Sequence, residues 1–159
     1  MEFPVLDRTD RSLLRLLQED ARRPFKELAT KVALASSTVH ERVARLRKQG
    51  VLRGIHADVD HRAFGLQIQA MVFVRLRKGM DKGMDKGNGF AEQICLAPWV
   101  LNVYHLAGRQ DFALHIVARD TDQLREQVMA ITEREEVRGV ETSLIFEHRR
   151  SHVMPDYSD

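Results

Sequence analysis

The hydrophobic period of this 159-residue chain changes at Gly50, and that change limits the folds open to it. Before Gly50, apolar residues recur three or four positions apart, as in Leu13, Leu14 and Leu17, which is the pattern of an amphipathic helix. After Gly50 the period becomes two, as in the run 68–76, which is rich in β-branched and aromatic residues. A helical first third followed by a strand-rich remainder predicts an α+β chain built of two units.

The first third is predicted to form three short helices. Asp7 can cap the first, with Asp10 close to the exposed amides of its first turn. Pro24 can open the second helix, where its missing N–H costs nothing. Only residues 33–35 separate the second helix from the third, which ends before Gly50. Two short helices joined by a three-residue turn are typical of a helix-turn-helix.

The third helix carries the main functional signal. Val39, Val43 and Leu46 fall on one narrow stripe, which predicts the side packed on the other helices. The opposite side is short and polar at its start and cationic toward its end, the order in which a recognition helix meets base edges and then phosphates. The alternatives are a solvated helix with a Glu41–Arg45 pair and, for Arg42, a salt bridge inside the domain. The candidate DNA-binding residues are Ser36, Ser37, Thr38, His40, Glu41, Arg42, Arg45 and Lys48.

The charge is unevenly distributed along the chain. Residues 1–65 contain 13 Lys and Arg against nine Asp and Glu, whereas residues 66–159 contain 12 against 14. Ten of the 13 cations are arginines, whose side chain suits phosphate and guanine. The basic first part therefore predicts double-stranded DNA as a partner.

The remainder is predicted to run β-α-β-β-α-β, the ferredoxin-like order in which two helices cover one face of an antiparallel sheet. The expected strands are 68–76, 99–107, 112–118 and 140–148, and the expected helices are 90–97 and one capped by Thr121 or Asp122, with Leu124, Val128, Met129 and Ile131 buried. The other sheet face is expected to pack on a second copy, which makes a homodimer. The tandem repeat KGMDKGMDKG at 78–87 is interpreted as an exposed, flexible loop, with a basic finger toward DNA or a neighbouring subunit as the alternative.

Several motifs together resemble the Lrp/AsnC family of bacterial and archaeal regulators. They are Leu6-Asp7-x-x-Asp10, Glu27-Leu28-Ala29, Val39-x-x-Arg42-Val43-x-Arg45-Leu46, Gly50-Val51-Leu52-x-Gly54 and Gly108-x-x-Asp111. The resemblance covers nearly the whole chain. It implies a dimer, often assembled into an octamer, that binds DNA through its helix-turn-helix and in many members senses an amino acid. The family usually has Gly and Ser where this chain has Ala33 and Ala35, so the cap of the third helix is expected to move to Ser36.

The Gly108-x-x-Asp111 turn is the candidate effector site. Gly108 permits a positive φ and a close approach of ligand, and Asp111 can accept from an α-amino group. The alternative is a structural hairpin turn in which Asp111 caps its own backbone. By resemblance, His105 on the neighbouring strand end is added to the effector-binding residues, and its polarity argues against leucine as the effector.

Other chemistry is not expected. The single cysteine, Cys95, forms no internal disulfide and no thiolate zinc cage, and the seven histidines lack metal-ligand spacing, so neither a metal nor a cofactor is predicted. No nucleophile, phosphate-loop or paired-carboxylate motif is present, so the chain is not expected to be an enzyme. No apolar run reaches the roughly 18 residues of a membrane span, and the start lacks a signal-peptide core, which predicts a cytoplasmic protein without a membrane partner.

The sequence thus predicts a winged or plain helix-turn-helix over 1–52, a linker or wing strand over 53–67, a ferredoxin-like sensing and oligomerisation domain over 68–149, and a tail over 150–159. The predicted function is that of a sequence-specific DNA-binding transcriptional regulator responding to a small molecule, an amino acid by resemblance. The alternative is a small-molecule sensor that acts through protein–protein contacts. A steep fall of affinity with salt distinguishes DNA binding from that alternative.

Overall fold

The computed structural model describes residues 4–77 and 84–156. The chain divides into two compact units: Met1–Asp58 together with Arg149–Asp159, and Val59–His148. The segment expected to be a free tail is thereby grouped with the helical unit, while the domain limits at 52, 67 and 149 stay predictions. Among the described residues, no helix combines the length and the apolar character that crossing a bilayer requires.

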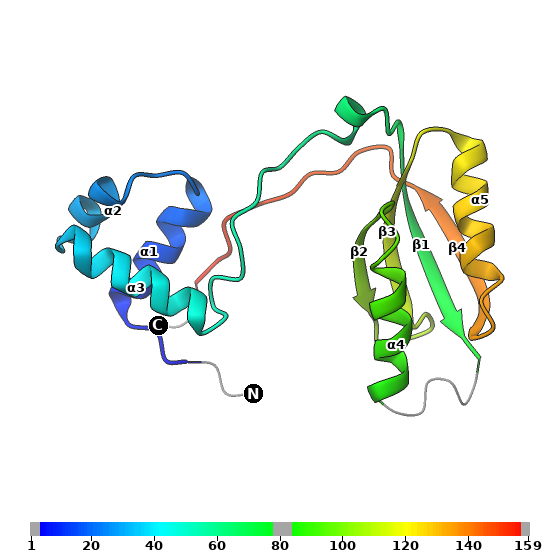
Figure 1. The fold of residues 1–159 in the computed structure, drawn as a ribbon, viewed down its shortest axis with the longest axis horizontal. Coiled ribbons are helices and arrows are strands. Elements are labelled where there is room, and N and C mark those ends of the chain that lie inside the picture. Colours follow the sequence, from blue (N-terminus) through cyan, green and yellow to red (C-terminus); the bar gives the residue numbers. More distant parts are fainter. Residues whose placement is uncertain (1–3, 78–83, 157–159) are drawn as a thin grey trace. The chain divides into compact units, whose positions relative to one another are not determined.

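The first unit contains the three predicted helices, α1 (Arg8–Glu19), α2 (Phe25–Val32) and α3 (Ser36–Lys48) (Figure 1). The side chain of Asp7 caps α1 by accepting from the N–H of Asp10 at 2.7 Å, as predicted. Their common core contains Leu13, Leu28, Val39 and Val43, with Leu46 also buried. Burying these side chains is what holds three helices that are each too short to be stable alone.

The cap predicted for α3 is wrong. Ser36 is already the first helical residue, and the N-cap is Ala35, which has no side-chain oxygen to offer the helix. The preceding turn is tight because Ala33 adopts the left-handed conformation, with φ 53° and ψ 44°, and the N–H of Leu34 bonds to the carbonyl of Ala29 at 3.0 Å. A glycine is the usual residue here, and alanine is accepted because Leu34 anchors the turn in the core.

The strand or wing predicted over residues 51–59 is also wrong. This segment contains neither helix nor strand. Its apolar side chains Ile55 and Val59 are exposed. A strand needs a partner for its backbone groups, and the alternating pattern alone cannot provide one. The 3₁₀ helix η1 (His61–Phe64) follows and leads into the sheet.

The second unit has the predicted β-α-β-β-α-β order (Figure 1). Its elements are β1 (Ile68–Leu76), α4 (Met84–Ile94), β2 (Val100–His105), β3 (Phe112–Ala118), α5 (Thr121–Thr132) and β4 (Val137–Leu144). The sheet order is β2-β3-β1-β4, and every neighbouring pair is antiparallel. This is the ferredoxin-like sheet, with β1 and β3 at its centre.

Both helices pack on the same face of the sheet. On that face, Val72 and Val74 of β1 and Leu114 and Ile116 of β3 are fully buried against α4 and α5. Their neighbours along β1, Met71 and Phe73, point to the other face and are only partly buried, which confirms the predicted alternation. The second face therefore keeps apolar surface that these helices do not cover.

Several boundaries differ from the predictions, including β2, which covers 100–105 rather than 99–107, and the end of α4, which is Ile94 rather than residue 97. Helix α4 begins at Met84, inside the repeat expected to be a loop, since each added helical residue gains a backbone hydrogen bond once Phe90 and Ile94 are packed. Residues 78–83 of that repeat lie outside the described residues. Strand β4 covers 137–144 rather than 140–148, because its pairing with β1 starts at Val137.

Helix α5 also differs in its cap and in one buried position. Its N-cap is Asp120, whose side chain accepts from the N–H of Gln123 at 2.8 Å, rather than Thr121 or Asp122. Met129 is 49% exposed, and Gln127 takes the buried position, where its amide donates to the carbonyl of Val117 at 3.1 Å. That bond to the β3 backbone satisfies the buried amide nitrogen, whereas Oε1 of Gln127 has no hydrogen-bond partner among the described residues.

Candidate nucleic-acid interface and effector turn

Helix α3 has the two faces that its sequence predicts. Val39, Val43 and Leu46 are buried, which sets the rotation of the helix on α1 and α2. The predicted contact residues that are exposed are Ser36, Ser37, His40, Glu41, Arg45 and Lys48, while Thr38 and Arg42 are partly buried. The exposed side is small and polar near Ser36 and cationic near Lys48, so it presents the order of groups that a major-groove helix requires.

The ring of His40 is fixed against the second helix. It stacks on Phe25, the first residue of α2, with ring centroids 3.7 Å apart and planes within 10°. The stacked imidazole remains exposed at its other face. His40 therefore lies on the predicted surface but is held in one orientation by an aromatic neighbour.

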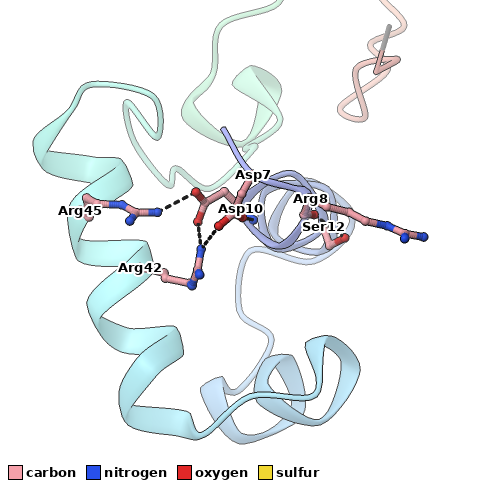
Figure 2. Close-up of polar contacts among 6 residues, drawn as sticks. All are labelled: Asp7, Arg8, Asp10, Ser12, Arg42 and Arg45. Carbon is pink, nitrogen blue, oxygen red and sulfur yellow. Dashed lines mark hydrogen bonds and ion pairs between the residues drawn. The ribbon is translucent and has the colours of Figure 1, made fainter. Parts of the chain in front are cut away.

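A cluster of two carboxylates and two guanidiniums joins α1 to α3 (Figure 2). Asp10 accepts from Nη1 of Arg42 at 2.9 Å through Oδ1 and from Nη2 of Arg45 at 2.6 Å through Oδ2. Asp7 accepts from the same Nη1 of Arg42 at 2.6 Å. Arg42 thus lies in the salt bridge inside the domain that was its alternative interpretation, and Arg45 pairs with Asp10 rather than with Glu41.

The cluster stabilises the charged forms of Asp7 and Arg42. The hydrogen bond from Arg42 holds the pKa of the Asp7 carboxyl below its usual value, and the N–H of Asp10 acts in the same direction. The hydrogen bonds to Asp7 and Asp10 raise the pKa of the Arg42 guanidinium above its usual value. The pairing therefore persists at neutral pH.

Asp10 is a site residue that the sequence interpretation missed. It is 2% exposed and was expected only near the amides at the start of α1. A signal was available, because Asp10 precedes Leu13 and Leu17 at helical spacing and so falls on the apolar stripe of α1. A carboxylate on a core-facing stripe indicates a buried cationic partner.

The candidate effector residues lie together at one end of the β2–β3 hairpin. His105 pairs with Phe112 in the register and stacks on its ring at 4.7 Å. Gly108 has φ +153°, and a Cβ built on it meets nothing within 4 Å. The turn therefore has open space beside a backbone conformation that other residues rarely adopt.

Asp111 has a structural contact that neither sequence interpretation contained. Its Oδ2 accepts from the N–H of Leu76 on β1 at 2.7 Å, and its own N–H bonds to the carbonyl of Val74 at 2.9 Å. The carboxylate thus bonds to β1 rather than to the backbone of its own turn. This bond joins the hairpin to the end of β1, at the bulge between Arg75 and Leu76. Substitutions at Asp111 must keep this acceptor if they are to test ligand binding alone.

A second polar cluster surrounds the buried His115 on β3. His115 Nε2 lies 2.6 Å from Gln69 Oε1, and Gln69 Nε2 lies 2.5 Å from a ring nitrogen of His61. His115 Nδ1 lies 3.3 Å from the side-chain nitrogen of Asn102, which can only donate. The ring of His115 is therefore satisfied in its neutral form. Burial, followed by the charges of His148 and His61, lowers the pKa of His115 in agreement with this arrangement.

Within residues 4–77 and 84–156, no three His, Cys, Asp or Glu side chains are placed to hold a metal ion. His105 and His115 have different neighbours: the first stacks on Phe112 and the second bonds to Gln69. These two histidines thus take part in packing and hydrogen bonds.

Comparisons with known proteins match both units. The family model of the AsnC-type helix-turn-helix domain matches residues 6–47, and that of the Lrp/AsnC ligand binding domain matches residues 69–154. The chain is 46% identical over 146 residues to the HTH-type transcriptional regulator AldR of Mycobacterium tuberculosis, covering 91% of this chain and 80% of that protein. It is 29% identical over 150 residues to the transcriptional regulator AzlB of Bacillus subtilis, covering 94% of each.

Two solved structures extend these matches to the fold. The crystal structure of the M. tuberculosis AldR aligns with a TM-score of 0.79 at 39% identity, covering 94% of this chain and 100% of that one. A transcriptional regulator of Neisseria meningitidis, solved as a complex with L-Met, aligns with a TM-score of 0.81 at 27% identity, covering 95% and 97%.

Proposed function

This chain belongs to the Lrp/AsnC family of helix-turn-helix transcriptional regulators, and from that premise we propose how it recognises DNA and what it senses. It is a DNA-binding regulator with a ligand-binding domain, and a sensor acting through protein contacts alone is not favoured. We propose that α3 enters the major groove, with Ser36, Ser37, Thr38, His40 and Glu41 toward base edges and Arg45 and Lys48 toward phosphate or guanine. A regulator of this kind is expected to work in the cytoplasm. The observation that carries the proposal is the exposed polar-to-cationic face of α3.

The working unit is proposed to be a homodimer joined through the uncovered face of the sheet, with assembly into an octamer left open. Two features support it: Met71 and Phe73 keep apolar surface on that face, and Leu101 and Tyr104 of β2 are about half exposed. Packing a second copy there would bury these side chains. A two-fold dimer would present two copies of α3 to successive major grooves, about 34–36 Å apart.

We propose that the effector is an amino acid bound at the β2–β3 hairpin by His105, Gly108 and Asp111. Gly108 leaves room for the ligand, and Oδ1 of Asp111 can accept from an α-amino group while Oδ2 keeps its bond to β1. The L-Met complex of the N. meningitidis relative supports this ligand class. A bound ligand would act by changing the separation of the two α3 helices.

Arg45→Ala is the direct test of the DNA-facing surface. The Arg45 side chain is 48% exposed, and one of its nitrogens is bound to Asp10, so its other N–H groups can reach a phosphate. If each copy contacts one phosphate, the substitution should reduce the slope of log affinity against log salt by about two per dimer. If Arg45 instead reads guanine, affinity should fall by about 1–3 kcal/mol per site and specificity should relax at one position. Equilibrium binding measured across a salt series distinguishes the two.

Arg15→Ala is the matched control. Arg15 is a 74% exposed arginine on α1 whose side chain pairs with Glu19 at 3.5 Å. The Arg15→Ala substitution removes the same charge from the same unit, and it should leave the slope of log affinity against log salt unchanged. An Arg45→Ala variant that binds the duplex with wild-type affinity and slope would show that another face of α3 lies in the groove.

A further inference from the structure

The carboxylate of Asp10 on α1 binds two arginines of α3, Arg42 and Arg45. Its side chain is 3% exposed, and each of its two oxygens accepts from a different guanidinium. Arg42 and Arg45 are three residues apart, so they leave α3 from the same side, one turn apart (Figure 2). Two bonds from one fixed carboxylate to adjacent turns therefore restrict the rotation of α3 about its own axis, in addition to the buried stripe of Val39, Val43 and Leu46.

The two arginines are not equivalent in this cluster. Nη1 of Arg42 donates to both Asp7 and Asp10, and its side chain is 24% exposed. Arg45 is bound through Nη2 to Asp10, and its side chain is 48% exposed. Arg42 therefore has its charge balanced by two carboxylates, whereas Arg45 keeps donors directed to solvent.

We propose that Asp10 is a positioning residue for DNA recognition. It fixes the rotation of α3 and, together with Asp7, keeps Arg42 away from DNA while leaving Arg45 able to contact a phosphate. This rests on the proposed role of α3 as the DNA-contacting helix. Because Asp7 and Asp10 balance the charge of Arg42, that arginine adds no attraction for duplexes of arbitrary sequence. Discrimination then depends on base contacts from a helix held in one rotation.

Asp10→Asn tests this in the full-length chain. The amide keeps the size of the side chain but removes the carboxylate charge that holds Arg45 and one of the two that hold Arg42, so that Asp7 alone retains Arg42. The probes are the duplex that the wild-type chain selects most strongly from random DNA and a shuffled duplex of the same composition. We expect the salt slope on the shuffled duplex to steepen, by up to about two per dimer, as the more weakly held Arg42 recruits a phosphate in each copy. The ratio of selected to shuffled affinity should fall about tenfold or more.

Glu19→Gln is the matched control, since it removes one carboxylate from the far end of α1, where Glu19 pairs with Arg15 and Arg23. It should leave both the ratio and the slope at wild-type values. If Asp10→Asn lowers the melting temperature but changes neither quantity, Asp10 serves folding alone and the proposal is wrong.

If Asp10→Asn does not fold, Arg42→Gln tests whether Arg42 is kept away from DNA. An arginine held away from DNA contributes no phosphate contact, so this variant should keep the wild-type salt slope even where its melting temperature falls. A slope reduced by about two per dimer would place Arg42 on the phosphates and overturn the proposal. Measurements on the wild-type chain distinguish failure of the Asp10 proposal from failure of the proposed function. If the wild-type chain shows no steep salt slope on either duplex, the proposed DNA-contacting role of α3 is wrong, whatever Asp10 does.

Discussion

Ser37→Glu is expected to abolish specific DNA binding while leaving the fold at least as stable as before. Ser37 is exposed in the first turn of α3, where the proposed geometry brings it to the base edges. A carboxylate there meets the strongly negative surface of DNA in both copies of the dimer. Taking about 1–3 kcal/mol for each disrupted base contact, two copies lose roughly 30-fold to 25,000-fold in affinity.

Stability should respond in the opposite direction, because an acidic side chain in the first turn interacts favourably with the helix dipole by about 0.3–1 kcal/mol. Thermal unfolding and equilibrium DNA binding of the same sample measure the two effects. Ser12→Glu is the matched control: Ser12 is an exposed serine near the start of α1, and Figure 2 shows it turned away from Arg42 and Arg45. A Ser37→Glu variant that binds DNA like the Ser12→Glu control would exclude the first turn of α3 from the interface.

Asp111→Asn is expected to uncouple the effector from DNA binding. The amide oxygen can still accept from the N–H of Leu76, so the contact to β1 is kept, while the negative charge proposed to hold an α-amino group is lost. Coupling between sites is typically worth about 1–3 kcal/mol, which corresponds to a roughly 5- to 150-fold change in operator affinity. We expect that change in the wild-type chain and close to none in the variant.

Calorimetry with each of the twenty amino acids identifies the ligand, and DNA binding with and without it measures the coupling. Asp120→Asn is the matched control, because it removes the same charge from the same unit and Asn caps a helix as well as Asp does. A wild-type response retained in Asp111→Asn would mean that Asp111 only joins the hairpin to β1. Failure of every amino acid to bind more tightly than about millimolar would reject the ligand class.

Periodicity predicted the elements whose apolar faces are repetitive. Helix α3 was found because Val39, Val43 and Leu46 form one stripe, and β1 because Val72 and Val74 alternate with Met71. The same reasoning failed over 51–59, where the pattern of a strand has no neighbouring strand to pair with. It also placed the start of α4 too late, since glycines in the repeat looked like a loop although helix propagation from Phe90 compensates for them.

Contacts between residues distant in sequence could not be predicted. Asp10 meets Arg42 and Arg45 across 32 and 35 positions, and Asp111 meets Leu76 across 35. Each contact depends on how helices or strands pack rather than on any local pattern. The sequence therefore predicted which residue types occupy the site and which face of the helix or turn carries them. The carboxylates that hold Arg42 and the backbone N–H that binds Asp111 could be identified only from the structure.

Selection of bound duplexes from random DNA by the wild-type chain tests the central claim most directly, namely that two copies of α3 read DNA side by side. The account predicts enrichment of a two-fold symmetric site whose half-sites are centred about 10–10.5 base pairs apart, or a multiple of that spacing. It also predicts that Ser37→Glu does not enrich this site while Ser12→Glu does. No enrichment by the wild-type chain, or an unpaired asymmetric site enriched equally by Ser37→Glu, would contradict it.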